Sequence, residues 1–241
     1  MEVIINRITG YEDAIAAMFY SKQNMTIDFF NEIRDAVDHC TDKNGAYRKD
    51  LSQDDPIKLK FDEWMNRLCK WGWTHITLLK FVDISSSVYG LHRAGQDDWD
   101  AHAERYDNRI IRASSRMSEF SGFSTYYEDK VVSTDTALSE LGISIPDEIV
   151  HDGVKYVKCT NGYIREDMKD VQDVKRGLYM LGIPSSFIFK VNVTQFAHVY
   201  KERNINGHAH PEVKECAETV ADILEDMCPW FTRELLLKIK N

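Results

Sequence analysis

The last third of the chain carries the clearest pattern of apolar and polar positions. Five apolar residues there recur at the spacing of one helical face, which predicts a helix over residues 211–227. These positions are Val213, Ala217, Val220, Ala221 and Leu224. The same periodicity predicts helices over residues 11–20, 26–37, 61–72 with a stop at Gly72, 98–117, 164–181 and 194–203.

Short apolar runs predict the strands. Residues 75–84 are rich in Ile, Leu, Val and Phe, and residues 186–191 read SFIFKV. Residues 148–156 predict a hairpin around Asp152-Gly153, a dipeptide that suits a tight turn between strands. Helices outnumber strands and the two do not alternate strictly, which favours the α+β class.

Composition and charge narrow the classes of function. The chain has 241 residues and a net charge of -9, which argues against general affinity for duplex nucleic acid. One small phosphorylated ligand held by a few arginines remains compatible with this charge. Its five cysteines are widely spread without a C-x-x-C pair, as is typical of a reducing cytosol. With no secretory signal and no apolar run long enough for a bilayer, we expect a cytoplasmic protein without a membrane partner.

The stretch NINGHAHPEV, residues 204–213, predicts a helix entry with unusual chemistry. Pro211 suits the first helical position, and Glu212 in the first turn complements the helix dipole. His210 then falls at the N-cap, with His208 just outside the helix. A positive helix end disfavours imidazolium, so we expect both rings to be neutral.

Arg203 ends the apolar face that Phe196, Val199 and Tyr200 form on the preceding helix. A guanidinium in this position needs an anionic or planar partner. The alternative interpretation is an arginine whose stem packs on apolar surface while its head reaches water at a helix C-terminus. A metal site at His208 and His210 is a further hypothesis, but no H-E-x-x-H or H-x-E…C-x-x-C signature accompanies it. We therefore predict no metal ligand.

The C-terminal region resembles the flavin-dependent thymidylate synthases. Their signature has an Asn, an Arg about eleven residues later, His-Ala, Glu with an aliphatic residue, and a helix that ends near Cys-Pro-Trp. The matching elements are Asn192, Arg203, His208-Ala209, Glu212-Val213 and Cys228-Pro229-Trp230, with one extra residue between Arg203 and His208. Arg176 matches a further arginine of that family.

A second family signature, R-H-R-x-x-S-x-N-E-x-S-x-R-Y-S, is similar to residues 110–124 in part. Arg112, Ser115 and the step Glu119-Phe120-Ser121-Gly122 match it. Ile110 and Ile111 replace the first Arg and the His, and Phe123 replaces the Arg-Tyr pair.

The resemblance implies one α+β domain over residues 1–241, with a mixed sheet, flanking helices and an insertion at about residues 90–108. It also implies a homotetramer that binds FAD, a pyrimidine deoxynucleotide such as dUMP, methylenetetrahydrofolate and NADPH. The implied activity is transfer of a methyl or hydroxymethyl unit to C5 of the pyrimidine.

The roles that the resemblance implies fall into three groups. Arg203 is the catalytic residue, stabilising negative charge that develops on the pyrimidine. The nucleotide is held by Arg176, Glu119, Ser121, Gly122 and Arg203. The flavin is held by His75, Arg112, Ser115, Asn192, His198 and His208.

Two alternatives stay open. Ile110 and Ile111 cannot bind a flavin pyrophosphate as Arg and His can, so the chain could be a non-catalytic nucleotide-binding homologue. A metal-dependent hydrolase that uses His208 and His210 is the second alternative, and it requires stoichiometric zinc.

Overall fold

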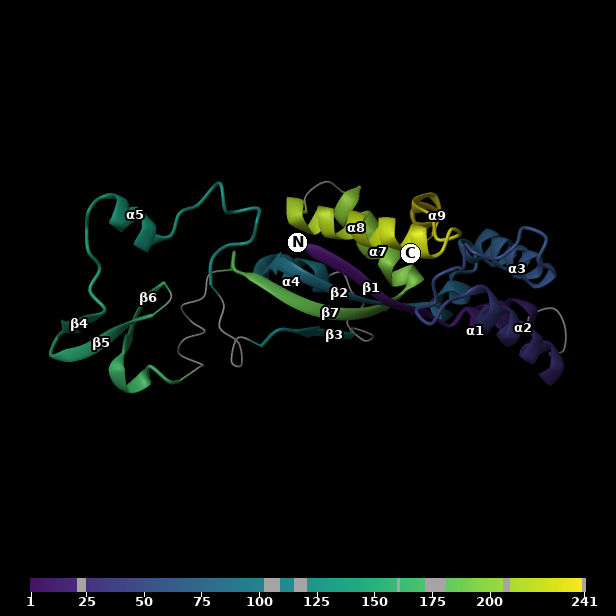
Figure 1. The fold of residues 1–241 in the computed structure, drawn as a ribbon, viewed down its shortest axis with the longest axis horizontal. Coiled ribbons are helices and arrows are strands. Elements are labelled where there is room, and N and C mark those ends of the chain that lie inside the picture. The colour runs from purple at the N-terminus through teal and green to yellow at the C-terminus, as the bar shows by residue number, and fades with distance from the viewer. Residues whose placement is uncertain are drawn as a thin grey trace.

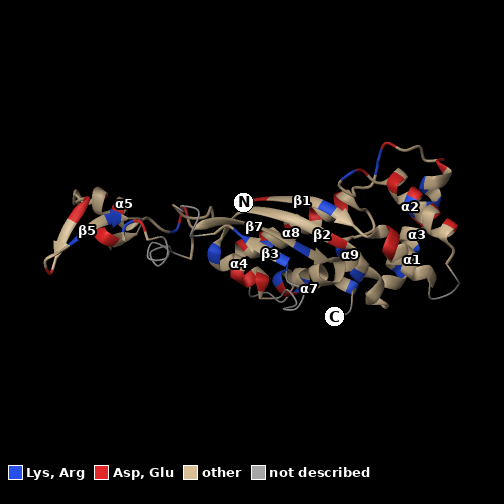
Figure 2. Cartoon of the chain, turned by 90° about the horizontal axis from the view of Figure 1, so that it is seen from below, with Lys and Arg blue, Asp and Glu red and all other residues tan. Residues whose placement is uncertain are grey.

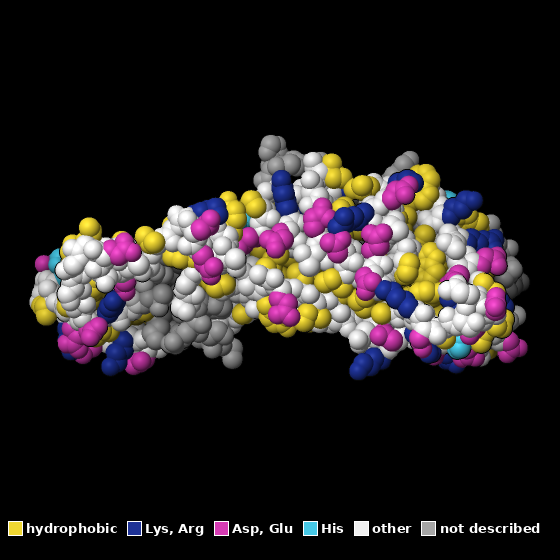
Figure 3. Space-filling model, turned by 45° about the horizontal axis from the view of Figure 1, so that its top comes forward, with side chains coloured by type: hydrophobic (Ala, Val, Ile, Leu, Met, Phe, Trp, Pro, Cys, Tyr) yellow, Lys and Arg dark blue, Asp and Glu magenta, His cyan; other side chains and the backbone are white. Residues whose placement is uncertain are grey.

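The computed structural model describes residues 1–20, 25–101, 109–114, 121–159, 161–171, 181–205 and 209–239. It forms a body built on a four-stranded sheet, from which a narrow arm extends at one end (Figures 1 and 3). Acidic and basic residues are interspersed along the chain in both parts (Figure 2).

The main sheet has the strand order β1-β2-β7-β3, and every described strand pair is antiparallel. Its strands are β1 (Glu2–Thr9), β2 (Asp83–His92), β7 (Pro184–Asn192) and β3 (Arg109–Arg112). Buried and more exposed residues alternate along β2 and β7, as expected for a sheet with one covered face. The α+β class is confirmed. The sheet was expected to be mixed, but every described strand pair in it is antiparallel.

Helices α7 (Val193–Asn204), α8 (Pro211–Met227) and α4 (Arg93–Asp100) cover the inner face of the sheet (Figure 1). The predicted apolar stripe of α8 is confirmed, because all five of its positions are buried. Trp99 of α4 is buried too, and its ring lies 5.1 Å from that of Phe189 on β7. This packing fixes α4 against the sheet.

The remaining helices of the body lie at the end opposite the arm (Figure 1). They are α1 (Tyr11–Tyr20), α2 (Ile27–Cys40), α3 (Pro56–Gly72) and the 3-10 helix η1 (Ile76–Phe81), with α9 (Arg233–Lys238) beside α7. Thr26 caps α2 and Asp55 caps α3 through their side chains, which explains where both helices begin.

The arm contains α5 (Thr134–Glu140), η2 (Glu166–Met168) and a second antiparallel sheet of order β4-β5-β6. Its strands are β4 (Glu148–His151), β5 (Val154–Cys159) and β6 (Gly162–Arg165). The predicted hairpin is confirmed: Asp152 and Gly153 both have positive φ, at 49° and 76°. Ile164 is the only buried apolar side chain among the described residues from 125 to 171.

Three sequence predictions are wrong in part. Residues 76–81 form η1 instead of a strand, because the short apolar run buries Leu79 against Gly72 as a helical turn. The helix expected over residues 98–117 stops at Asp100, and Arg109–Arg112 pair with β7 as a strand. The helix expected from residue 164 begins instead as β6 and η2, and residues 172–180 lie outside the described part.

Within the described residues, no helix combines the length and the apolar composition needed to cross a membrane.

Candidate functional site

The site is built around the first turn of α8. His210 is the N-cap, as predicted, and its Nδ1 accepts a 3.3 Å hydrogen bond from the backbone N–H of Glu212. Pro211 occupies the first helical position, where a missing N–H costs nothing. This arrangement turns the side chain of Glu212 inward, where it is 4% exposed.

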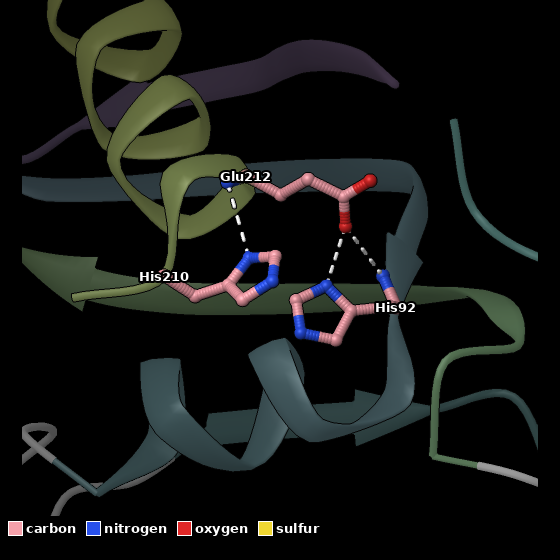
Figure 4. Close-up of side chains that lie close together, drawn as sticks. All are labelled: His92, His210 and Glu212. Atoms are coloured by element: carbon pink, nitrogen blue, oxygen red, sulfur yellow. Dashed lines mark hydrogen bonds and ion pairs between the residues drawn. The ribbon is translucent and has the colours of Figure 1, made fainter. Parts of the chain in front are cut away.

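The carboxylate of Glu212 meets His92, which ends β2 and is the N-cap of α4 (Figure 4). His92 is 2% exposed, and its Nδ1 pairs with Oε2 of Glu212. The other carboxylate oxygen, Oε1, accepts a 3.0 Å hydrogen bond from the backbone N–H of Tyr126. Among the described residues, His92 is the only side chain that forms an ion pair with Glu212.

Aromatic rings enclose this pair. The rings of His92 and His210 lie 4.2 Å apart, and that of Tyr126 lies 4.4 Å from His210. The Tyr127 hydroxyl lies 3.1 Å from Nε2 of His210. Because Nδ1 of His210 accepts the capping hydrogen bond, neutral His210 carries its proton on Nε2 and donates it to Tyr127.

The protonation states follow from these contacts. Burial raises the pKa of Glu212, but the hydrogen bond from the Tyr126 N–H and the contact with His92 more than offset it and hold that pKa below its usual value. Burial, assisted by His92, lowers the pKa of His210. Glu212 is therefore ionised and His210 neutral at neutral pH, which agrees with the expectation of a neutral ring.

Arg203, at the end of α7, has an anionic partner inside the chain. Its Nη1 lies 3.0 Å from Oδ1 of Asp98 on α4, and Nη2 donates to the Asp98 carbonyl oxygen. Arg203 is 6% exposed, and burial lowers its pKa despite the opposing effect of Asp98. Its buried Nε has no hydrogen-bond acceptor among the described residues. The interpretation of Arg203 as an arginine reaching into solvent is therefore wrong.

The sequence matches no protein-family model and no curated protein. The structure, in contrast, matches two solved structures of thymidylate synthase X (ThyX) from Helicobacter pylori, both with FAD and dUMP. Their TM-scores are 0.55 and 0.54, each at 15% identity. The matches cover 98% of this chain and 100% and 99% of the two ThyX chains. This chain has the ThyX fold.

The described residues that were predicted to hold a flavin occupy different parts of the ThyX fold. Asn192 caps α7 in a capping box with Gln195, and His198 lies half-buried on the same helix. His75 is exposed just before η1, which packs against α7. Asn192 and Arg203 lie at opposite ends of α7, about 16 Å apart along its axis.

Arg112 lies on β3 and is held by α4. Its Nη2 lies 2.8 Å from Oδ2 of Asp100 and 3.1 Å from the carbonyl oxygen of Gln96, and its Nη1 pairs with Asp97. Arg112 and Arg203 thus both meet carboxylates of the same short helix.

Ser121 and Gly122 are exposed where the arm begins, and Gly122 has a φ of 73°. The other predicted site residues, Ser115, Glu119, Arg176 and His208, lie outside the described residues.

Sequence reasoning missed the pairing of His92 with Glu212 and that of Arg203 with Asp98. The first pair is 120 residues apart and the second 105. No local spacing reveals such contacts. The available signal was compositional: three acids, Asp97, Asp98 and Asp100, lie within one helix beside two unexplained arginines.

Proposed function

We propose that this chain is a flavin-dependent enzyme that transfers a methyl or hydroxymethyl unit to C5 of a pyrimidine deoxynucleotide monophosphate such as dUMP. Methylenetetrahydrofolate is the carbon donor and NADPH the reductant. The observation that carries the proposal is the match of 98% of this chain to the ThyX fold. The matched ThyX structures contain FAD and dUMP. FAD, when bound, supplies the reducing electrons.

Arg203 supports nucleotide binding. A buried N–H without an acceptor is costly, and Nε of Arg203 is such a group among the described residues. A pyrimidine carbonyl oxygen would accept from Nε while Asp98 keeps the rest of the guanidinium in place. In this role Arg203 holds the base and stabilises negative charge that develops on it.

Of the residues on and beside α7 that were predicted to contact the flavin, two are assigned to direct contact. His198 is half-buried on α7, and His75 is exposed just before η1, which packs against α7. Asn192 is committed to the helix cap, where its side chain accepts from Gln195 N–H at 3.0 Å and from the Thr194 hydroxyl at 2.6 Å. Asn192 therefore shapes the start of α7, and His75 and His198 are the residues we assign to direct flavin contact.

The 5′-phosphate requires a cation other than Arg203, whose charge Asp98 already balances. We assign phosphate binding to Arg176. Glu119, Ser121 and Gly122 are assigned to further contacts with the nucleotide.

A homotetramer also belongs to the proposal. Ile4, Ile188 and Ile111 lie in one cross-strand row on the outer face of the main sheet, and each is at least 43% exposed. Ser87 of β2 stands between Ile4 and Ile188 in this row, and three exposed isoleucines on one sheet face favour association between copies.

The test is a flavin titration followed by visible spectroscopy. We expect about one FAD per chain, and a shift of the flavin band when dUMP is added. Arg203→Lys keeps a cation beside Asp98 but removes the Nε donor. Because the donor is assigned to the base, the substitution should lower the binding affinities for dUMP and for deoxyuridine by the same factor. Arg48→Lys, on an exposed loop where Arg48 pairs with Asp50, is the matched control and should bind as the native chain does.

The outcomes separate the alternatives. Nucleotide binding without flavin would identify a non-catalytic homologue. Binding of neither ligand would overturn the proposal.

A further inference from the structure

His92, His210 and Glu212 bring two imidazoles and one carboxylate together, with one ligand atom of each within 4.8 Å of the others. They come from the end of β2 and the first turn of α8, two elements whose packing is part of the core. Their convergence therefore does not depend on an exposed loop.

We propose that His92, His210 and Glu212 form a binding site for a divalent transition-metal ion of the Zn²⁺ or Fe²⁺ class. Two histidines and one carboxylate are a ligand set that holds such ions while leaving further coordination positions open. This site does not rest on the proposed flavin chemistry.

The surroundings supply the support that metal ligands need. The Tyr126 N–H holds Oε1 of Glu212 at 3.0 Å and leaves Oε2 on the side of the two rings. The His92 ring is confined by Gly95, where an added Cβ would lie 2.7 Å from its Cε1. Outer contacts of this kind orient ligands and are a general feature of metal sites.

A metal ion can reach the site from the side of His210. His92 and Glu212 are buried, whereas His210 is half-buried and meets Tyr126 and Tyr127 at the start of the arm. In Figure 4 the second ring nitrogen of His210 lies on the side of His92. The open positions of the ion would face these tyrosines.

Two rearrangements accompany binding. Nδ1 of His92 and Oε2 of Glu212 give up their contact with each other, because both groups become ligands and a ligand atom carries no proton. His210 shifts its remaining proton from Nε2 to Nδ1. It gives up both the contact of Nε2 with the Tyr127 hydroxyl and the 3.3 Å capping bond, which is already at the long end for an N–H donor. Affinity must therefore fall as the pH is lowered.

The experiment uses the full chain, freed of metal by a chelator and then titrated with Co²⁺ as a spectroscopic probe. We expect visible ligand-field bands that saturate at about one Co²⁺ per chain, and that Zn²⁺ displaces. His92→Asn and His210→Asn each remove an imidazole. His210 caps α8 through its side chain and asparagine can replace that cap, whereas His92 makes no side-chain capping bond to α4, so both helices retain their starts.

Each variant should bind Co²⁺ more than about 100-fold more weakly, since even outer-shell changes cost 10- to 100-fold. His151→Asn is the matched control, because His151 is exposed on β4 beside Asp152 and should leave binding unchanged. Circular dichroism checks that every variant is folded, and His210→Asn, at a half-buried cap, is the variant on which the conclusion rests.

Absence of the Co²⁺ bands in the native chain would overturn the proposal. So would bands that persist in folded His210→Asn. Flavin uptake does not enter this test, so its result is independent of the proposed function.

Discussion

Gly95 offers the sharpest test of the buried pair beneath α8. A Cβ at this position would lie 2.7 Å from Cε1 of His92 and 3.0 Å from its Nδ1. The ring is 2% exposed and bounded by Glu212 and His210, so it can make room for the Cβ only by giving up these contacts. Gly95→Ala should therefore push His92 away from Glu212.

Two opposing effects set the magnitude. Alanine is better than glycine in a helix by about 1 kcal/mol. Breaking a buried ion pair costs about 3–5 kcal/mol, because one charged group loses its partner. Taking the lower end, since the Tyr126 N–H still holds Glu212, Gly95→Ala should lower the free energy of unfolding by about 2 kcal/mol.

Urea unfolding measures this loss directly. With a slope of about 2–3 kcal/mol per molar urea, the midpoint should fall by roughly 1 M. The control is the same substitution in a His92→Asn background, where the shorter side chain leaves space and Gly95→Ala should be neutral or stabilising by up to about 1 kcal/mol. If Gly95→Ala stabilises the native chain, helix propensity dominates and the reasoning about His92 is refuted.

Three further predictions concern charge and thiol chemistry. Arg203→Ala should lower the free energy of unfolding by about 1–3 kcal/mol in urea, because its partner Asp98 is partly exposed, and an unchanged midpoint would mean that the pair contributes nothing. Since contacts hold the pKa of Glu212 below its ordinary value of about 4.3, its contribution is full above that value and is lost as the pH falls through the folded pKa. Glu212→Gln should flatten the acid limb of stability against pH, and an identical limb would contradict this origin. Burial raises the pKa of Cys228 to about 12, so Ellman's reagent at pH 8 should react first with half-buried Cys159, and the fast phase should vanish in Cys159→Ser.

The parts of the fold that sequence predicted correctly are those in which local chemistry decides. The stripe on α8, the cap at His210 and the turn at Asp152-Gly153 each depend on residues within a few positions of one another. Residues 76–81 were misassigned because a short apolar run fits a strand and a buried helical turn equally well. Arg109–Arg112 form a strand because they pair with the edge of β7. The sequence of residues 98–117 carries no information about that distant partner.

The sequence indicated one residue of each interacting pair in the candidate site but not its partner. Arg203, His210 and Glu212 stand out in the sequence because a cation, a cap and an acid occur where an apolar face ends. Their partners do not, because His92 and Asp98 reach them from β2 and α4 through the packing of the sheet against α8.

The short helix α4 sets the charge balance around Arg112 and Arg203. Its carboxylates pair with Arg112 and with Arg203, so each cation is balanced before any ligand arrives. A phosphate at either arginine must displace an internal carboxylate whose position the buried Trp99 helps to fix. A neutral acceptor faces no such competition, and the buried Nε of Arg203 has no hydrogen-bond acceptor among the described residues. Under the proposed function, these charges favour a base over a phosphate as the partner of Arg203, and the phosphate would have to bind on another part of the chain.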